Sequence, residues 1–130
     1  MSDEDKLKQQ MAQIGVRYIG RTLGELQRMH ELLHSVLNGS PALLKDLEHL
    51  AHKIHGSGAM FGFDGLSENA GEIEHIAGFL GKGEGPEQYK NLSESELHQR
   101  LQAAVTKLDA ATRKAATERG IAINIDGNGA

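Results

Sequence analysis

The chain has 130 residues and a net charge of −4, and it contains no cysteine and no tryptophan. The missing cysteines exclude disulfides and thiol catalysis, and without a long basic run the chain lacks the footprint of a nucleic-acid-binding protein. No apolar stretch approaches the length of a membrane span, and the acidic, polar start is not a secretory signal. We therefore expect a free-standing cytoplasmic domain that binds neither nucleic acid nor membrane.

The first predicted element covers residues 3–38, where apolar side chains recur at helical spacing. Ser2 is a good capping residue, and the acidic residues after it suit the positive end of a helix dipole. Gly15 and Gly20 favour a break or a kink, so the segment is either one helix or two in series. Asn38 followed by glycine predicts its end.

Residues 41–61 form the next predicted helix. Ser40 followed by Pro41 is typical of a helix start, with a cap and then proline at the first helical position. At about 100° per residue, one narrow apolar stripe predicts the buried face of this helix. The residues of that stripe are Leu43, Leu47, Leu50, Ile54 and Phe61.

The second half of the chain predicts two more helices. One begins at Asp64, which would cap it, and the glycine-rich residues 81–91 form the loop that follows. Ser93 and Glu96 have the spacing of a capping box, which predicts a last helix over 94–118.

These segments predict an all-α fold. Four amphipathic helices with mostly short connections favour an up-and-down four-helix bundle, here with an additional N-terminal helical segment. The bundle would cover residues 1–119, and residues 120–130 would form a flexible C-terminal tail.

His52 is the residue with the most chemical promise. It lies in the middle of the 41–61 helix but about 160° away from the apolar stripe, so its side chain should be exposed. Lys45, Glu48, Gly56 and Ala59 share its side of the helix. The small residues cost helix propensity, about 0.8–1 kcal/mol for each interior glycine. We interpret them as a surface that lets a partner approach His52.

An exposed imidazole can accept a phosphoryl group through a free ring nitrogen. The added negative charge needs a nearby cation, for which Lys53, His55 and Lys45 are candidates. The other ring nitrogen needs an acceptor that holds the imidazole in place, and a carboxylate on the next helix would serve.

Two other interpretations remain open for this histidine. One is a solvated surface histidine without a function, although solvation does not need a cleared surface. The other is a metal site, because Glu31-x-x-His34 and Glu72-x-x-His75 have the spacing used in di-iron bundles. The outward direction of His52 makes this site less favoured, and we expect no metal ligands.

The sequence from 51 to 74 resembles the histidine-containing phosphotransfer (HPt) domain. That family has a His-x-x-Lys-Gly pattern, then small residues and a further glycine ten positions after the histidine. His52, Gly56, Ser57, Ala59 and Gly62 occupy these places. The next helix of the family has an L-x-x-x-A-x-x-(I/L)-(E/Q) segment, which Leu66, Ala70, Ile73 and Glu74 match.

The resemblance implies that His52 is the phosphoacceptor and that Glu74 orients its imidazole. The family lysine is replaced by His55, and a histidine is only partly charged near neutral pH, whereas a lysine is always charged. Lys53 would then help to neutralise phosphate, and Lys45, Glu48, Gly56 and Ala59 would dock the partner.

The resemblance also implies a monomeric phosphorelay intermediate rather than an enzyme with its own ATP site. Its partners would be receiver domains of response regulators and a hybrid sensor histidine kinase. It would need no cofactor of its own, since Mg²⁺ is expected on the receiver. The alternative is a docking module that binds a regulator or a kinase without transferring phosphate.

Overall fold

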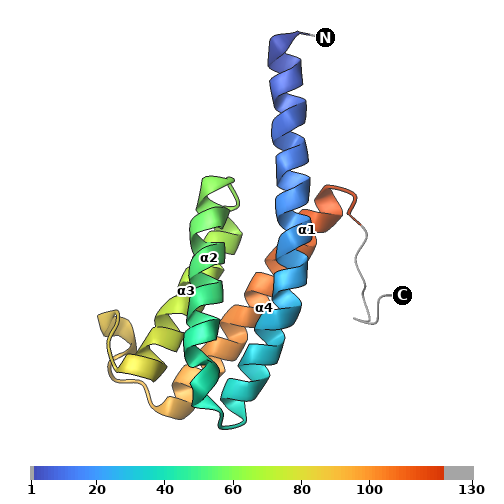
Figure 1. The fold of residues 1–130 in the computed structure, drawn as a ribbon. Helices are drawn as coiled ribbons and strands as arrows, with labels where there is room; N and C mark the ends of the chain where they lie inside the picture. The colour runs from blue at the N-terminus through green and yellow to red at the C-terminus, as the bar shows by residue number, and fades with distance from the viewer. Residues whose placement is uncertain (1, 122–130) are drawn as a thin grey trace.

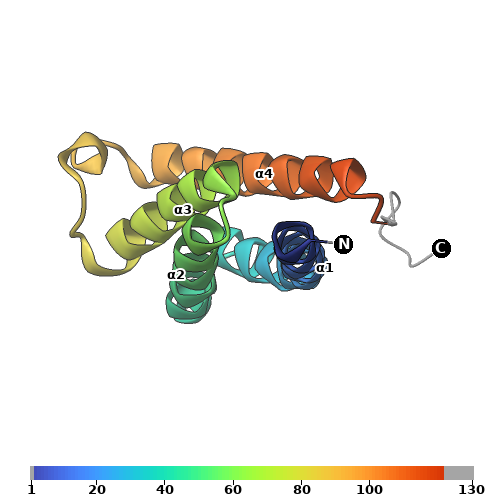
Figure 2. The same ribbon diagram turned by 90° about the horizontal axis from the view of Figure 1, so that it is seen from above.

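The computed structural model describes residues 2–121. Its helices are α1 (Asp3–Leu37), α2 (Leu44–Met60), α3 (Asp64–Lys82) and α4 (Glu94–Glu118), with short 3-10 turns at Pro41–Leu43 and Glu87–Tyr89. Each helix packs on the next one, and α4 returns to pack on α1 (Figures 1 and 2). The predicted all-α, up-and-down four-helix bundle is therefore confirmed.

The core consists of one apolar stripe from each helix. Burial of these aliphatic side chains is the main force that holds the four helices together. Its fully buried members include Ile19, Met29, Leu32, Leu47, Ile54, Ile73, Ile76, Leu101, Val105 and Leu108.

Helix α1 is a single helix of 35 residues, so the break that Gly15 and Gly20 suggested does not occur. Between these glycines, Tyr18 and Ile19 are buried, and their packing outweighs the weak helix propensity of glycine. The expected additional N-terminal segment is the first part of α1. Its residues 3–14, which we call the arm, are exposed and extend beyond the other helices (Figure 1).

Two of the predicted helix starts differ in detail from the structure. Helix α2 begins at Leu44, after a 3-10 turn in which the Leu43 amide donates to the Ser40 carbonyl, so Ser40 does not cap α2. Phe63 precedes α3 without a capping bond from its side chain, and Asp64 is the first helical residue. The charge of Asp64 still suits the helix dipole.

The capping predictions for α1 and α4 are confirmed. The Ser2 hydroxyl accepts from the Asp5 amide at 3.1 Å, and the Ser93 hydroxyl accepts from the Glu96 amide at 3.1 Å. These side chains satisfy backbone donors that have no partner inside the helix.

The residues at the end of α2 bring this helix into contact with α1. Gly62 adopts a φ of +81°, a conformation in which glycine is favoured, and its amide donates to the Ala59 carbonyl at 3.2 Å. Phe61 was predicted to be buried with the apolar stripe but is 39% exposed. It lies one residue beyond α2, with its ring centroid 4.9 Å from that of Tyr18.

Within residues 2–121, no helix is both long enough and apolar enough to span a membrane. The predicted C-terminal tail lies almost entirely outside the described residues, which end at Ile121.

Candidate functional site

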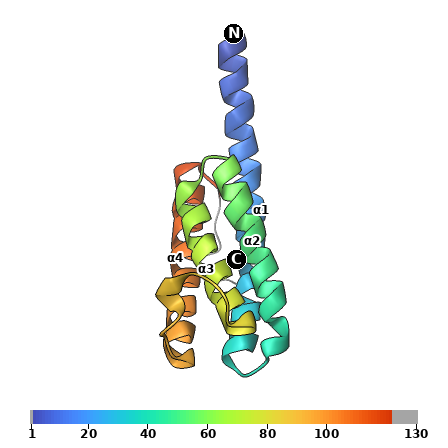
Figure 3. The same ribbon diagram turned by 90° about the vertical axis from the view of Figure 1, so that its left-hand side faces the viewer.

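The site lies where α2 and α3 run side by side, in the view of Figure 3. His52 projects from the middle of α2, and its side chain is 73% exposed, as the helical spacing predicted. Glu74 comes from α3, and its carboxylate Oε2 lies 2.5 Å from His52 Nδ1. The structure thus brings together the two residues that the resemblance had paired.

The second oxygen of the same carboxylate contacts another imidazole. Glu74 Oε1 lies 3.0 Å from His55 Nδ1. His52 and His55 are three residues apart on α2, which puts them on neighbouring parts of one helix face. One carboxylate therefore bridges two imidazoles, and this bridge was not predicted.

The two imidazoles favour the ionised form of the Glu74 carboxylate. Its partial burial acts to raise its pKa, but the hydrogen bonds from His55 and His52 and the charges of these rings lower it. The net result is a pKa below the ordinary value of 4.5. An ionised carboxylate only accepts hydrogen bonds, so both Nδ1 atoms donate to it. When the His52 ring is neutral, a proton on Nδ1 leaves the lone pair of the ring on Nε2.

Lys53 lies on the other flank of α2. Its Nζ is 2.8 Å from the Glu25 carboxylate of α1, so this cation points toward α1 while His52 and Glu74 meet at α3. Beside this ion pair, the hydroxyls of Tyr18 and Ser57 are hydrogen-bonded at 2.9 Å. Lys53 therefore helps to join α2 to α1 in the free protein.

The four predicted docking residues divide into two groups. Lys45, Gly56 and Ala59 are exposed on the same side of α2 as His52. Glu48 differs, because its side chain is only 20% exposed and pairs with Lys82 of α3 at 3.8 Å. Its carboxylate therefore turns toward α3 rather than into the open ring around His52.

The two glycines of the small-residue patch have different surroundings. A Cβ added at Gly56 would have nothing within 4 Å, which fits an open surface beside His52. A Cβ added at Gly58 would lie 3.0 Å from the Ser67 amide nitrogen and 3.3 Å from the Phe63 carbonyl oxygen. Gly58 is therefore a packing residue that lets α2 and α3 come close.

A row of small residues on α3 completes this close contact. Ser67, Gly71 and Gly78 are all buried, and they face Gly58, His55 and Glu48 of α2, respectively. We call this row the α3 seam. Sequence reasoning missed it, although a spacing of four and seven residues places Ser67, Gly71 and Gly78 on one side of a helix.

Two residues of the metal hypothesis, Glu31 and His34, have other partners. Glu31 pairs with Arg28 at 3.6 Å, and His34 contacts Asn38. In the part of the chain that the structure describes, no group of three or more histidine, aspartate or glutamate side chains is arranged to hold a metal ion.

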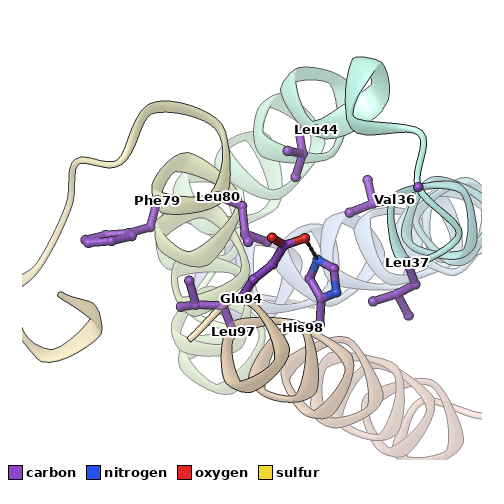
Figure 4. Close-up of a pocket in the computed structure, with 9 residues that line it drawn as sticks. Val36, Leu37, Leu44, Phe79, Leu80, Glu94, Leu97 and His98 are labelled. Atoms are coloured by element: carbon purple, nitrogen blue, oxygen red, sulfur yellow. Dashed lines mark ion pairs between the residues drawn. The ribbon is translucent and has the colours of Figure 1, made fainter. Parts of the chain in front are cut away.

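A separate groove of about 640 Å³ lies near the end of the bundle where α1 stops and α2 begins. His98 and Glu94 of α4 point toward each other there at 3.9 Å, and the remaining walls are mostly aliphatic (Figure 4). The groove includes neither His52 nor Glu74, so it does not belong to the candidate site.

Comparison with known protein families gave a match. The model of the family described as "Hpt domain" matches residues 17–111, which include every residue of the site and exclude the arm. No curated protein and no solved structure matched the chain.

Proposed function

The chain belongs to the Hpt domain family, whose members take part in phosphorelay and two-component signalling, and we propose that His52 is its phosphoacceptor. In this proposal the protein takes a phosphoryl group from the aspartyl phosphate of one receiver domain and passes it to another. It has the role of a relay and does not consume ATP itself.

One observation carries the proposal. An imidazole with 73% of its side chain exposed has one of its two nitrogens fixed by a carboxylate. A histidine that served only to be solvated would not need such an orienting partner. A nucleophile does need one, because its lone pair must point at the reacting atom.

The transfer step requires no proton movement at the attacking atom. His52 Nε2 forms a bond to phosphorus while the bond from phosphorus to the aspartyl oxygen breaks, and that electron pair leaves with the aspartate carboxylate. The ring gains positive charge as the bond forms. Glu74 stabilises this charge through the hydrogen bond at Nδ1.

The surroundings of His52 suit a protein donor. Gly56 and Ala59 leave the surface beside the imidazole open, so that a receiver can bring its phosphoaspartate to Nε2. A transient complex of this kind needs only a small interface. The receiver would bring Mg²⁺ and most of the charge stabilisation for the phosphoryl group.

The alternative function is a docking module that binds a receiver or a kinase without taking the phosphoryl group. Two contacts favour it, since two of the three candidate cations near the histidine are engaged with carboxylates. Lys53 is paired with Glu25, and His55 is bonded to Glu74.

The deciding experiment is phosphoryl transfer from a panel of purified, phosphorylated receiver domains to the wild type, to His52→Gln and to His34→Gln. His34→Gln is a matched control, because His34 is an exposed histidine near the end of α1. The relay predicts rapid, acid-labile labelling of the wild type and of His34→Gln but none of His52→Gln. Receiver binding without labelling of the wild type would favour the docking module.

A further inference from the structure

The bridge between the two imidazoles raises the question of what His55 does. From sequence, His55 was a candidate cation for the phosphoryl group, because it occupies the place of a lysine. In the structure, its Nδ1 donates to Glu74 Oε1 at 3.0 Å, while Glu74 Oε2 accepts from His52. The polar atom through which His55 contacts the site is therefore directed at the carboxylate.

The ring of His55 is held by the α3 seam. Gly71 lies directly beneath it, and a Cβ added there would be 3.2 Å from His55 Cε1 and 3.3 Å from Nε2. The Ser67 hydroxyl donates to the His55 carbonyl at 2.7 Å. Ser67, Gly71 and Glu74 follow one another on one side of α3, so this stretch of α3 contacts both the backbone and the ring of His55.

We propose that His55 is a positioning residue, seated on Gly71, which holds the Glu74 carboxylate so that its other oxygen faces His52. This inference rests on the proposed role of His52 as phosphoacceptor. Glutamate has three rotatable side-chain bonds, and a single bond to an exposed imidazole leaves the carboxylate free to turn. The second bond, to a ring that is itself fixed, sets the plane of the carboxylate.

This role differs from phosphate neutralisation in what it requires. A neutraliser needs positive charge at position 55 and no particular contact with Glu74. A positioning residue needs a donor at the place of Nδ1 and no charge. Asparagine carries an amide donor at the corresponding place on its side chain, whereas lysine brings charge without the fixed ring.

The test compares His55→Asn, His55→Ala and His55→Lys in two measurements. The first is the tautomer of His52 in the unphosphorylated protein, from the nitrogen chemical shifts of its ring in NMR spectra. The second is the rate of phosphoryl uptake from a phosphorylated receiver. We expect His55→Asn to keep the Nδ1–H tautomer and a rate near that of the wild type. His55→Ala and His55→Lys should lose the fixed tautomer and slow uptake by about tenfold, as is typical for the loss of an orienting partner.

Gly71→Ala provides an independent test of the seat. In a chain that keeps His55, the methyl group of Gly71→Ala should displace the His55 ring and lower the rate of phosphoryl uptake as His55→Ala does. In the His55→Ala background the space is already free, so Gly71→Ala should cause no further loss. This non-additivity would show that Gly71 acts through His55 and not through a general disturbance of the fold.

Three results would overturn the proposal. One is a wild-type His52 without the Nδ1–H tautomer, and another is an unchanged tautomer and rate in His55→Ala. The third is a rate in His55→Lys that equals or exceeds the wild type while His55→Asn falls with His55→Ala. If the wild type takes up no phosphate at all, the proposed function fails. The tautomer measurement then still decides what His55 does to Glu74.

Discussion

Alanine substitutions at Gly56 and Gly58 should change the stability of the bundle in opposite directions. Both glycines lie inside α2, two residues apart, and alanine is the better helix former at both positions. They differ in what the new methyl group would meet. At Gly56 it would meet open space, whereas at Gly58 it would lie 3.0 Å from the Ser67 amide nitrogen of α3.

The magnitudes follow from these contacts. Gly56→Ala should stabilise the protein by about 0.8–1 kcal/mol, the difference in helix propensity. Gly58→Ala has the same gain, but its clash is with backbone atoms, which cannot move without separating α2 from α3. Overpacking of this kind costs about 1–3 kcal/mol, so the net change is a loss of about 1 kcal/mol. The two variants should therefore differ by about 2 kcal/mol.

Urea denaturation followed by circular dichroism measures this difference. With an m-value of about 2 kcal/mol/M, the midpoints of the two variants should lie about 1 M apart, with the wild type between them. Equal shifts in one direction would refute the reasoning, because helix propensity alone would then decide both positions. Gly58→Ala should also slow phosphoryl uptake, since a wider gap between α2 and α3 lengthens the distance from His52 to Glu74.

Three further predictions address the site, an ion pair and the arm. Glu74→Gln should slow phosphoryl uptake about 10- to 100-fold in a transfer time course, because a neutral amide stabilises the charged ring less, and an unchanged rate would contradict the orienting role. Partial burial acts to raise the pKa of Asp109, but hydrogen bonds from His30 and Arg113 bring it below the ordinary 3.8. Asp109→Asn should therefore cost about 1–2 kcal/mol above pH 5, and urea titrations should show this cost vanishing as the wild type is protonated below pH 4. An equal cost at pH 3 and pH 7 would argue against that linkage. Deleting residues 2–13 should move the urea midpoint by no more than about 0.3 M, since surface residues without tertiary partners contribute little, and a large loss would mean that the arm packs on the bundle.

The sequence was sufficient to predict the main residues of the site, because helical periodicity determines the side of a helix to which each side chain points. The distance of His52 from the apolar stripe predicted its exposure, and the resemblance supplied Glu74 as its partner on the next helix. Local rules were also sufficient for Ser2 and Ser93, whose capping bonds depend only on residues within one turn.

Contacts between helices were beyond these rules. Periodicity gave the side of α2 on which Lys53 lies but not Glu25 of α1, to which it is bonded. Periodicity also gave the side of α2 on which Glu48 lies, but it did not predict that this side chain turns toward Lys82 of α3. Gly15 illustrates the same limit, because packing on the bundle keeps α1 continuous where propensity alone favours a break.

The α3 seam determines whether this site can be moved to another protein. Installing a histidine and a glutamate at matching positions of a designed bundle would reproduce the residue types, but ordinary leucine and alanine packing would hold the two helices too far apart. The transferable unit is therefore the pair of helices with their small residues, Gly58 on one side and Ser67, Gly71 and Gly78 on the other. A graft that carried this pair of helices would take the spacing between His52 and Glu74 with it.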